Sequence, residues 1–241
     1  MLDWLRRDPR SVPTLELAGR TLPVVIRRLD RARRMTMRLA PGGSEVRISI
    51  PRWGRTEEAL DFARSRRDWL ENQLSRLTTP TPVGDGATIP FRGVPLILRH
   101  DPGSRRKPAL TESEIVIGGA EASLVPRLSR WLASEARTLL ALDLQDYCSR
   151  AGRPPPKLAL SGARRRWGSC SACGTIRINW RLVMAPDFVR RSVVAHEVAH
   201  LTHFDHSPAF HACLGELFEG NLAAANAWLK REGPTLYAPF G

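Results

Sequence analysis

The chain has 241 residues, of which 42% are hydrophobic and 25% are charged, so it can bury a substantial core and has the composition of a soluble globular protein. Its four cysteines are too few and too scattered for a disulfide scaffold. No run of about 18 apolar residues occurs, which excludes a transmembrane helix, and the N-terminus lacks the apolar segment of a secretory signal. We therefore predict a cytoplasmic protein.

The net charge of +13 favours polyanionic partners such as nucleic acid or nucleotides. Arginine supplies almost all of the positive charge, with 34 Arg against 3 Lys, and a biased genome composition produces the same excess. An ordinary solvated basic surface is therefore the alternative. No zinc-finger pair, aromatic RNA-binding motif or lysine-rich tail in the sequence decides between the two.

Strand-like segments dominate the first half of the chain; they lie at residues 22–29, 35–40, 45–51, 94–100 and 114–119. One helix is predicted among them, over residues 56–77, because Thr56 can serve as its N-cap and apolar residues recur on one stripe. The proline- and glycine-rich residues 78–86 are predicted to form a connection.

Helices dominate the second half. A predicted helix runs from residue 126 to about 151, where three prolines prevent its continuation. Strand-like ends then flank a basic segment within residues 157–186, and Asp187 opens the next helix. Ser207, followed by proline, and Asn221 are predicted N-caps of two further helices.

These elements predict an α+β fold in which a β-rich part precedes a helical one. We divide the chain into an N-terminal arm at residues 1–20, a β-rich region with one helix at 21–120, and a catalytic region at 121–241.

Five of the six histidines lie within residues 193–211, and two of them form the sequence His196-Glu197-Val198-Ala199-His200. Residues four apart on a helix share one face, so two imidazoles can bind one cation with Glu197 beside them as a general base. The alternative is an amphipathic helix that carries histidines without a metal.

A catalytic zinc site needs a third protein ligand and an open fourth position. His203 lies about 10 Å along the helix axis from His196, which is too far for one ion. His206 has room to turn back before Ser207 starts another helix, so we predict His206 as the third ligand. His203 and His211 are candidates for contacts with substrate, and Asp205 for a helix stop or a partner of a ligand ring.

Cys170 and Cys173 form a single C-x-x-C pair, which by itself is a weak signal for a metal or redox site. Cys148 and Cys213 do not provide a second pair at the right spacing. The sequence leaves the role of Cys170 and Cys173 open.

With these residues in view, the chain resembles the YgjP-like metallopeptidase family, relatives of the WLM and SprT-like zinc proteins. The resemblance rests on several quoted segments: VVIRRLDRARRMTMRLAPGGSEVRISIP, RRDWLENQL, RWGSCS, GTIRINWRL and HEVAHLTHFDHSPAF. It implies a zincin-like catalytic domain with the metal site on a helix. It also implies one Zn²⁺ per chain on His196, His200 and His206, with Glu197 as the catalytic carboxylate.

Two departures from the family pattern are visible. The family often has Asn before the third histidine and Trp after the phenylalanine, where this chain has Asp205 and His211. The resemblance implies the same ligand set despite both changes, but it does not extend to the shape and charge of the substrate cleft. Some members are assigned as nucleotide pyrophosphatases, so the family does not by itself settle the substrate.

The first hypothesis is a zinc-dependent metallopeptidase that uses three histidines and a glutamate general base. The strand TIRINWRL, residues 175–182, can then form the edge of the cleft and pair with an extended peptide substrate. Arg166 is the candidate substrate-binding residue. Arg166, His203 and His211 are the candidates for stabilising an oxyanion.

Two alternatives remain. The first keeps the metal and changes the substrate to a nucleoside triphosphate, because the run Arg164-Arg165-Arg166 suits phosphate oxygens. The second is a basic nucleic-acid-associated zinc protein of the SprT-like type. In its non-enzymatic form the zinc would be structural and would need a fourth protein ligand, which the spacing does not supply.

Overall fold

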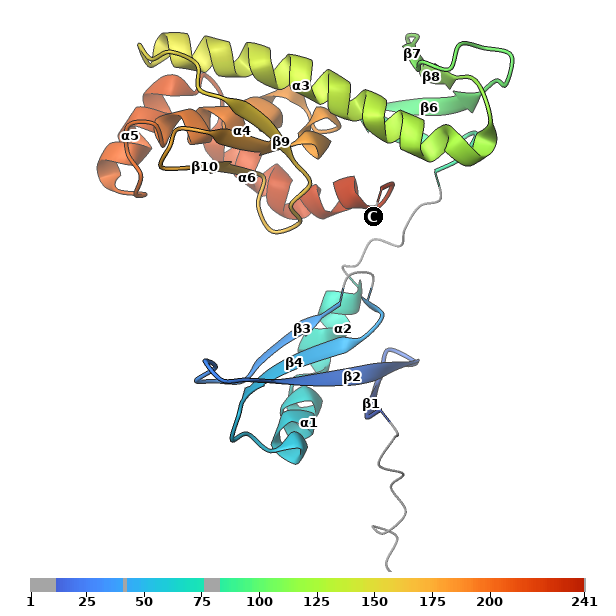
Figure 1. Ribbon diagram of the computed structural model, residues 1–241, viewed down its shortest axis with the longest axis vertical. Helices are drawn as coiled ribbons and strands as arrows, with labels where there is room; N and C mark the ends of the chain where they lie inside the picture. Colours follow the sequence, from blue (N-terminus) through green and yellow to red (C-terminus); the bar gives the residue numbers. More distant parts are fainter. Residues whose placement is uncertain (1–11, 41–42, 76–82, 241) are drawn as a thin grey trace, which may run out of the picture. The chain divides into compact units, whose positions relative to one another are not determined.

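The computed structural model describes residues 12–40, 43–75 and 83–240 and divides the chain into two compact units, Met1–Thr79 and Pro80–Gly241 (Figure 1). The fold is mixed α+β, with N-terminal sheets followed by helices, as predicted from the sequence. Among the described residues, no helix is long and apolar enough to cross a membrane.

Unit 1 is built on a four-stranded sheet in the order β1-β2-β4-β3. Its strands are β1 (Thr14–Leu17), β2 (Arg20–Leu29), β3 (Thr36–Leu39) and β4 (Val46–Pro51). β2 runs parallel to β4, and the other two pairs are antiparallel. Side chains alternate between the two faces of each strand, so one face is apolar and the other is polar.

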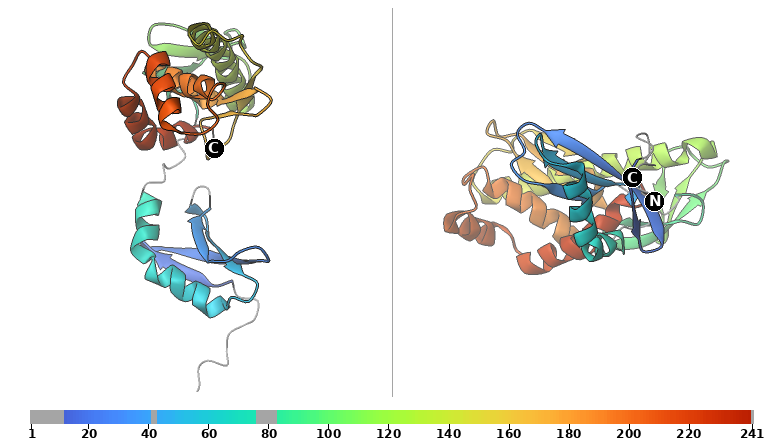
Figure 2. Two further views of the ribbon diagram at one scale, coloured as in Figure 1. Left: turned by 90° about the vertical axis from the view of Figure 1, so that its left-hand side faces the viewer. Right: turned by 90° about the horizontal axis from the view of Figure 1, so that it is seen from below.

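Two short helices, α1 (Thr56–Ser65) and α2 (Arg67–Ser75), cover the apolar face of this sheet (Figure 2). The sequence predicted one helix over residues 56–77 with Thr56 as its N-cap, but the structure breaks the helix at Arg66 and makes Arg55 the N-cap. The hydroxyl of Thr56 instead accepts a hydrogen bond from Arg28 of β2 at 2.9 Å. Residues 76 and 77 lie outside the described residues.

Unit 2 begins with a sheet in the order β5-β6-β8-β7. Its strands are β5 (Thr88–Phe91), β6 (Val94–His100), β7 (Ala109–Leu110) and β8 (Glu114–Ile117), and the short 3-10 helix η3 (Glu121–Ser123) leads into the long helix α3 (Leu124–Arg150).

The units divide at residues 79/80, whereas our sequence-based division falls at 120/121. The physical reason is burial. The apolar side chains of this sheet, among them Leu98 and Ile115, are fully buried in one core with Leu128 and Leu132 of α3. These strands therefore belong with the helices that follow them. In unit 1, residues 14–17 of the predicted arm form a strand, and residues 1–11 lie outside the described residues.

A second sheet of unit 2 has three strands in the order β10-β11-β9. They are β9 (Leu158–Ser161), β10 (Gly168–Cys170) and β11 (Ile176–Asn179), and the 3-10 helix η4 (Trp180–Val183) follows directly. The predicted strand over residues 175–182 thus ends early. The side chain of Asn179 caps η4 by accepting a hydrogen bond from the amide of Arg181 at 3.1 Å, which turns the chain out of the sheet.

The remaining helices are α4 (Asp187–Ala199), α5 (Pro208–Leu217), α6 (Leu222–Arg231) and the 3-10 helix η5 (Gly233–Tyr237). The predicted N-caps Ser207 and Asn221 are confirmed, because each side chain accepts a hydrogen bond from a backbone amide of the first turn. Nine of the 13 residues of α4 are buried. This helix is therefore the central element of unit 2.

Two consecutive arginines attach α4 to α3. Arg190, with 3% of its side chain exposed, donates to the buried carboxylate of Asp143 at 2.7 Å. Arg191 donates to Asp143 at 3.2 Å, to Asp146 at 2.7 Å and to Glu219 at 2.7 Å. Because removal of one partner of the Arg190–Asp143 pair leaves a buried charge uncompensated, that pair is costly to break, by about 3–5 kcal/mol. The two arginines set the position of α4 along α3.

Glu219, which follows α5, completes this network by accepting hydrogen bonds from Tyr147 at 2.9 Å and from Arg150 at 2.8 Å. Burial raises the pKa of Glu219, but hydrogen bonds from Arg191, from its own amide and from Tyr147 outweigh burial and lower this pKa to about 2. A carboxyl whose folded pKa lies below its ordinary value stabilises the fold above that ordinary value. The contribution is lost as pH falls toward the folded pKa.

We expect Glu219→Gln to lower the midpoint of thermal unfolding at pH 7 by roughly 2–4 °C. This shift corresponds to a loss of about 1 kcal/mol in the free energy of unfolding, the contribution expected of a charged hydrogen-bond network whose glutamate is half exposed. The deficit should shrink as pH falls from about 4.5 toward 2, because the wild-type carboxyl is then protonated as well. Calorimetry across this pH range measures the effect.

Glu216→Gln is the matched control, since Glu216 is an exposed residue of α5 three positions away. It should leave the midpoint unchanged at each pH. A deficit of Glu219→Gln that is the same at pH 7 and at pH 3 would contradict the charge interaction.

Candidate metal centre

The C-terminal end of α4 carries two histidines on one face. His196 lies in the last turn, and His200 is the residue at which the helix ends, still in helical conformation with φ −66° and ψ −16°. Residues four apart in a helix lie one turn from each other, and the ring centroids of these two histidines are 4.9 Å apart. The helix therefore directs both imidazoles toward one point.

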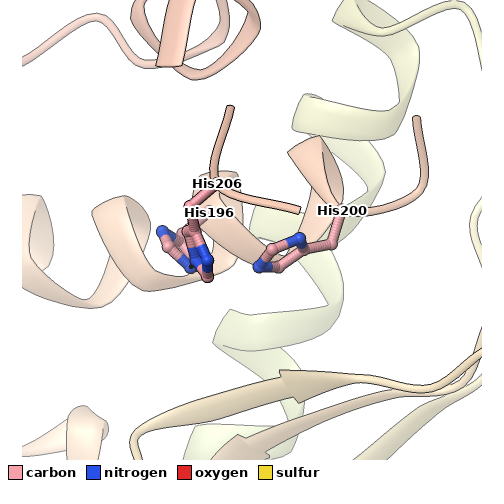
Figure 3. A group of neighbouring side chains, drawn as sticks. All are labelled: His196, His200 and His206. Carbon is pink, nitrogen blue, oxygen red and sulfur yellow. Dashed lines mark hydrogen bonds between the residues drawn. The ribbon is translucent and has the colours of Figure 1, made fainter. Parts of the chain in front are cut away.

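The chain reverses direction after His200 and brings a third histidine to the same point. Ser207 caps α5 by accepting a hydrogen bond from the amide of Phe210 at 3.4 Å, with a proline as the first helical residue. This helix start holds His206, whose Nε2 lies 3.3 Å from Nε2 of His196. The ligand nitrogens of the three histidines all lie within 4.8 Å of one another (Figure 3).

A backbone carbonyl orients the ring of His200. Nδ1 of His200 lies 2.9 Å from the carbonyl oxygen of His203. Because a carbonyl can only accept a hydrogen bond, Nδ1 must carry the proton, which leaves the lone pair on Nε2 free for a cation. His203 thus acts here through its backbone.

Phe210 on α5 is a residue of this site that sequence reasoning missed. Its ring lies 5.0, 4.6 and 4.8 Å from the rings of His196, His200 and His206, respectively, and it is fully buried. The hydrogen bond that its backbone amide donates to the hydroxyl of Ser207 places it on the first turn of α5. The sequence signal was its position three residues after the predicted N-cap, on a helix start already linked to the third histidine.

The electrostatics of the triad suit a cation with nitrogen ligands. Burial, followed by the neighbouring charges of His200, His206 and His211, lowers the pKa of His196 to about 4. Its imidazole is therefore neutral at pH 7, with a lone pair to donate. Three imidazole nitrogens that converge in this way are a donor set that fits zinc and leaves a coordination position open.

Glu197 points from α4 toward the strand β10. Its side chain is 4% exposed, its carboxylate accepts a hydrogen bond from the backbone amide of Cys170, and Oε2 has no hydrogen-bond partner among the described residues. Burial raises the pKa of Glu197 to about 7, although the charge of Arg166 and the Cys170 amide act in the opposite direction. A buried carboxylate with one unpartnered oxygen thus lies next to the histidines.

Gly168 makes room for this carboxylate. A Cβ atom at position 168 would lie 2.3 Å from Oε1 of Glu197 and 2.7 Å from its Cγ, distances that real Cβ atoms do not adopt. The backbone of β10 therefore lies directly against the side chain of Glu197. Any side chain at position 168 would force Glu197 or the strand to move.

Asn179 holds the segment that leads into β10. Its buried side-chain amide donates to the carbonyl oxygen of Ala163 and to the hydroxyl of Tyr237, each at 2.8 Å. Its backbone amide donates to the carbonyl oxygen of Trp167 at 2.7 Å. Asn179 and Trp167 belong to the segments that carried the family resemblance, so these segments order the loop beside Glu197.

The edge of this sheet is not the strand predicted from the sequence. We expected residues 175–182 to offer an edge to a peptide, but β11 lies between β10 and β9 and pairs with both. The physical reason is that the basic segment folds back as a hairpin through Gly174, which has φ +78°. Within the described part of the chain, β10 pairs on one side only and is the edge strand next to Glu197.

The other candidate residues lie at different positions around the site. Arg166 is exposed, and its charge acts on Glu197. His211 is exposed, with its ring centroid 6.4 Å from that of His206. Asp205 accepts a hydrogen bond from the amide of Ser207 at 3.4 Å and so belongs to the start of α5.

Cys170 and Cys173 are both free thiols at the β10–β11 turn. Burial and then the charge of Glu197 raise the pKa of Cys170. Cys173 is exposed, and hydrogen bonds from Ser171 and Thr175 lower its pKa to about 7.

Residues 33–232 match the model of a family described as YgjP-like, metallopeptidase domain. This match covers the histidine triad, Glu197 and the second sheet of unit 2. The chain belongs to the YgjP-like family. Membership indicates a metal-dependent hydrolase and implies a peptide or protein substrate. No curated protein and no solved structure matches the chain significantly.

We expect Gly168→Ala to destabilise the protein by roughly 1–3 kcal/mol, because the new methyl group overlaps the Glu197 carboxylate. In a Glu197→Ala background the overlap is gone, so the same substitution should cost much less. Denaturant unfolding of the four proteins in the presence of a chelator measures this coupling without any bound metal.

Gly162→Ala is the matched control, since the atom nearest to a Cβ there is Nη1 of Arg181 at 3.8 Å, an ordinary contact. It should change stability little in either background. Equal destabilisation by Gly168→Ala in both backgrounds would mean that Glu197 does not set the requirement for glycine.

Proposed function

We propose that the protein is a zinc-dependent peptidase that uses Glu197 as its general base. The observation that carries this proposal is the convergence of three histidine nitrogens within 4.8 Å of one another, beside a buried carboxylate with an unpartnered oxygen. Membership of a metallopeptidase family supports the same conclusion.

His196, His200 and His206 would hold one zinc ion per chain through their ring nitrogens. When bound there, zinc supplies a Lewis acid that acidifies water and polarises a carbonyl group. His200 is already oriented for this role by the His203 carbonyl, and Phe210 packs against all three rings. The imidazoles therefore need little reorganisation to bind the ion.

Glu197 would take the proton of the attacking water on Oε2 and deliver it to the leaving nitrogen. The hydrogen bond from the Cys170 amide and the contact with Gly168 hold the carboxylate in place. The remaining oxygen is thereby available for proton transfer.

The substrate would lie along β10. This strand has an unpaired edge among the described residues and packs against the carboxylate of Glu197 through Gly168. An extended peptide added to this edge would form backbone hydrogen bonds that do not depend on its sequence. Arg166, two residues before this strand, would contact the polar backbone or a developing negative charge of the substrate.

Removal of one proposed ligand should remove the metal. We expect about one zinc per chain in the wild type by elemental analysis, and loss of most of it in His206→Ala, because two imidazoles bind zinc far more weakly than three. His211→Ala is the matched control: its ring is exposed nearby, and zinc should be retained. Full zinc occupancy in His206→Ala would point to Asp205 or His203 as the third ligand instead.

Glu197→Gln keeps the size of the side chain and removes its basicity. We expect it to retain zinc and the fold while turnover falls about 10²- to 10⁴-fold, the usual contribution of a general base. Zinc-loaded wild type and variant are compared on casein, on peptides and on nucleoside triphosphates.

We expect the wild type to hydrolyse casein and peptides but not nucleoside triphosphates, and the variant to lose that hydrolysis. If the wild type instead hydrolyses nucleoside triphosphates alone and the substitution abolishes that activity, Glu197 remains the general base but the peptidase assignment is rejected. Unchanged turnover on every substrate would reject Glu197 as the base.

A further inference from the structure

The charges of unit 1 are segregated between its sheet and its helices. The strands and loops over residues 12–40 and 43–55 contain ten arginines and three acidic residues, whereas α1, α2 and the residue between them contain three arginines and five acidic residues. The helices cover one face of the sheet. The positive charge is thus concentrated on the part of the unit that the helices leave uncovered.

Five arginines define what we call the arginine face: Arg27, Arg31, Arg33, Arg34 and Arg38. All five are exposed, and none forms an ion pair with any residue that the structure describes. The helix side differs, because Arg64 pairs with Asp61 at 2.8 Å and Arg67 with Glu71 at 3.0 Å. Five unpaired guanidinium groups thus gather on the helix-free face and its loop, whereas two of the three arginines on the helix side are paired.

Strand register places two members of the arginine face on the same side of the sheet, and the other three lie in the adjoining loop. Arg27 of β2 and Thr36 of β3 are both paired with Ser49 of β4, so they point to the helix-free face. Arg38 lies two residues further along β3 on that face. Arg31, Arg33 and Arg34 lie in the loop that joins β2 to β3.

An exposed tryptophan adjoins this loop. Trp53 is 79% exposed in the turn between β4 and α1. Pro51, two residues earlier, is paired with Leu29 at the end of β2, and Arg52 lies 3.9 Å from Asp30 at the start of the loop between β2 and β3. A large flat ring that packs so little on its own unit is available to a partner.

We propose that the arginine face and Trp53 bind single-stranded nucleic acid. Guanidinium groups without protein partners match phosphate oxygens in charge and in geometry, and their succession along a sheet face and a loop suits a repeating phosphate backbone. Trp53 provides a platform on which an unpaired base stacks. A duplex would bury its bases and leave the tryptophan without a partner.

An anionic membrane shares the charge of nucleic acid but needs more apolar surface. Among the described residues of unit 1, four large apolar side chains are exposed, namely Val12, Leu29, Trp53 and Trp69, and of these Leu29 and Trp53 adjoin the loop between β2 and β3. Stable interfacial anchoring requires a continuous apolar face or a lipid chain. The surface therefore fits a nucleic acid better than a lipid surface.

The test uses the full chain and a fluorescein-labelled 20-nucleotide oligothymidine, with binding followed by anisotropy over a series of salt concentrations. Replacing Arg31, Arg33 and Arg34 together with Gln should weaken binding at least tenfold in low salt. It should also reduce the slope of log affinity against log salt by about 2, since each phosphate contact contributes about 0.7 on single strands.

The matched control replaces Arg64, Arg66 and Arg67 with Gln, which removes the same charge from the helix side. It should change affinity and slope little. Circular dichroism and thermal midpoints check that each variant is folded. Equal weakening by the two triple variants would overturn the proposal, because net charge alone would then explain binding.

Trp53→Ala tests the stacking platform. It should weaken oligothymidine binding about 5- to 150-fold, the range for loss of one base–aromatic stack, and leave binding of heparin, a polyanion without bases, unchanged. Trp69→Ala on α2, where the ring is 43% exposed, is its control. Equal loss on heparin, or binding to phosphatidylserine vesicles without binding to oligothymidine, would overturn the assignment to nucleic acid.

Discussion

The burial of α4 on nearly all sides is the constraint on which the rest of unit 2 depends. Valine and alanine side chains fill its apolar contacts, and the buried pair between Arg190 and Asp143 sets its position along α3. A buried ion pair tolerates little displacement, because a small shift leaves a charge without its partner. The last turn of α4 is thereby fixed, and with it the positions of His196 and Glu197.

Two neighbouring elements then complete the site from opposite directions. Phe210 on α5 packs against all three histidine rings, and Gly168 on β10 makes room for the carboxylate of Glu197. Phe210 acts through a large buried ring, whereas Gly168 acts because it has no side chain. Both position the polar groups by shape rather than by hydrogen bonds, so that Nε2 of His200 and Oε2 of Glu197 remain free for chemistry.

The arginines of this chain serve different purposes in its two units. Arg190 and Arg191 of α4 form ion pairs with carboxylates and hold helices together, whereas the five residues of the arginine face in unit 1 have no such partners among the described residues. The net charge counts both kinds of arginine alike and so does not show which of them are available to a ligand. The pairing of each guanidinium, rather than the total of +13, carries the argument for a polyanionic partner.

The sequence by itself determined the α+β class, most strands and helices, the capping residues Ser207 and Asn221, and the grouping of His196, His200 and His206. These follow from local rules: helical period, turn chemistry and four-residue spacing. Tertiary structure alone decided the boundary at residues 79/80, the edge position of β10, and the contacts of Phe210 and Gly168. Each of these depends on which distant surfaces bury one another, and a pattern along one chain does not contain that information.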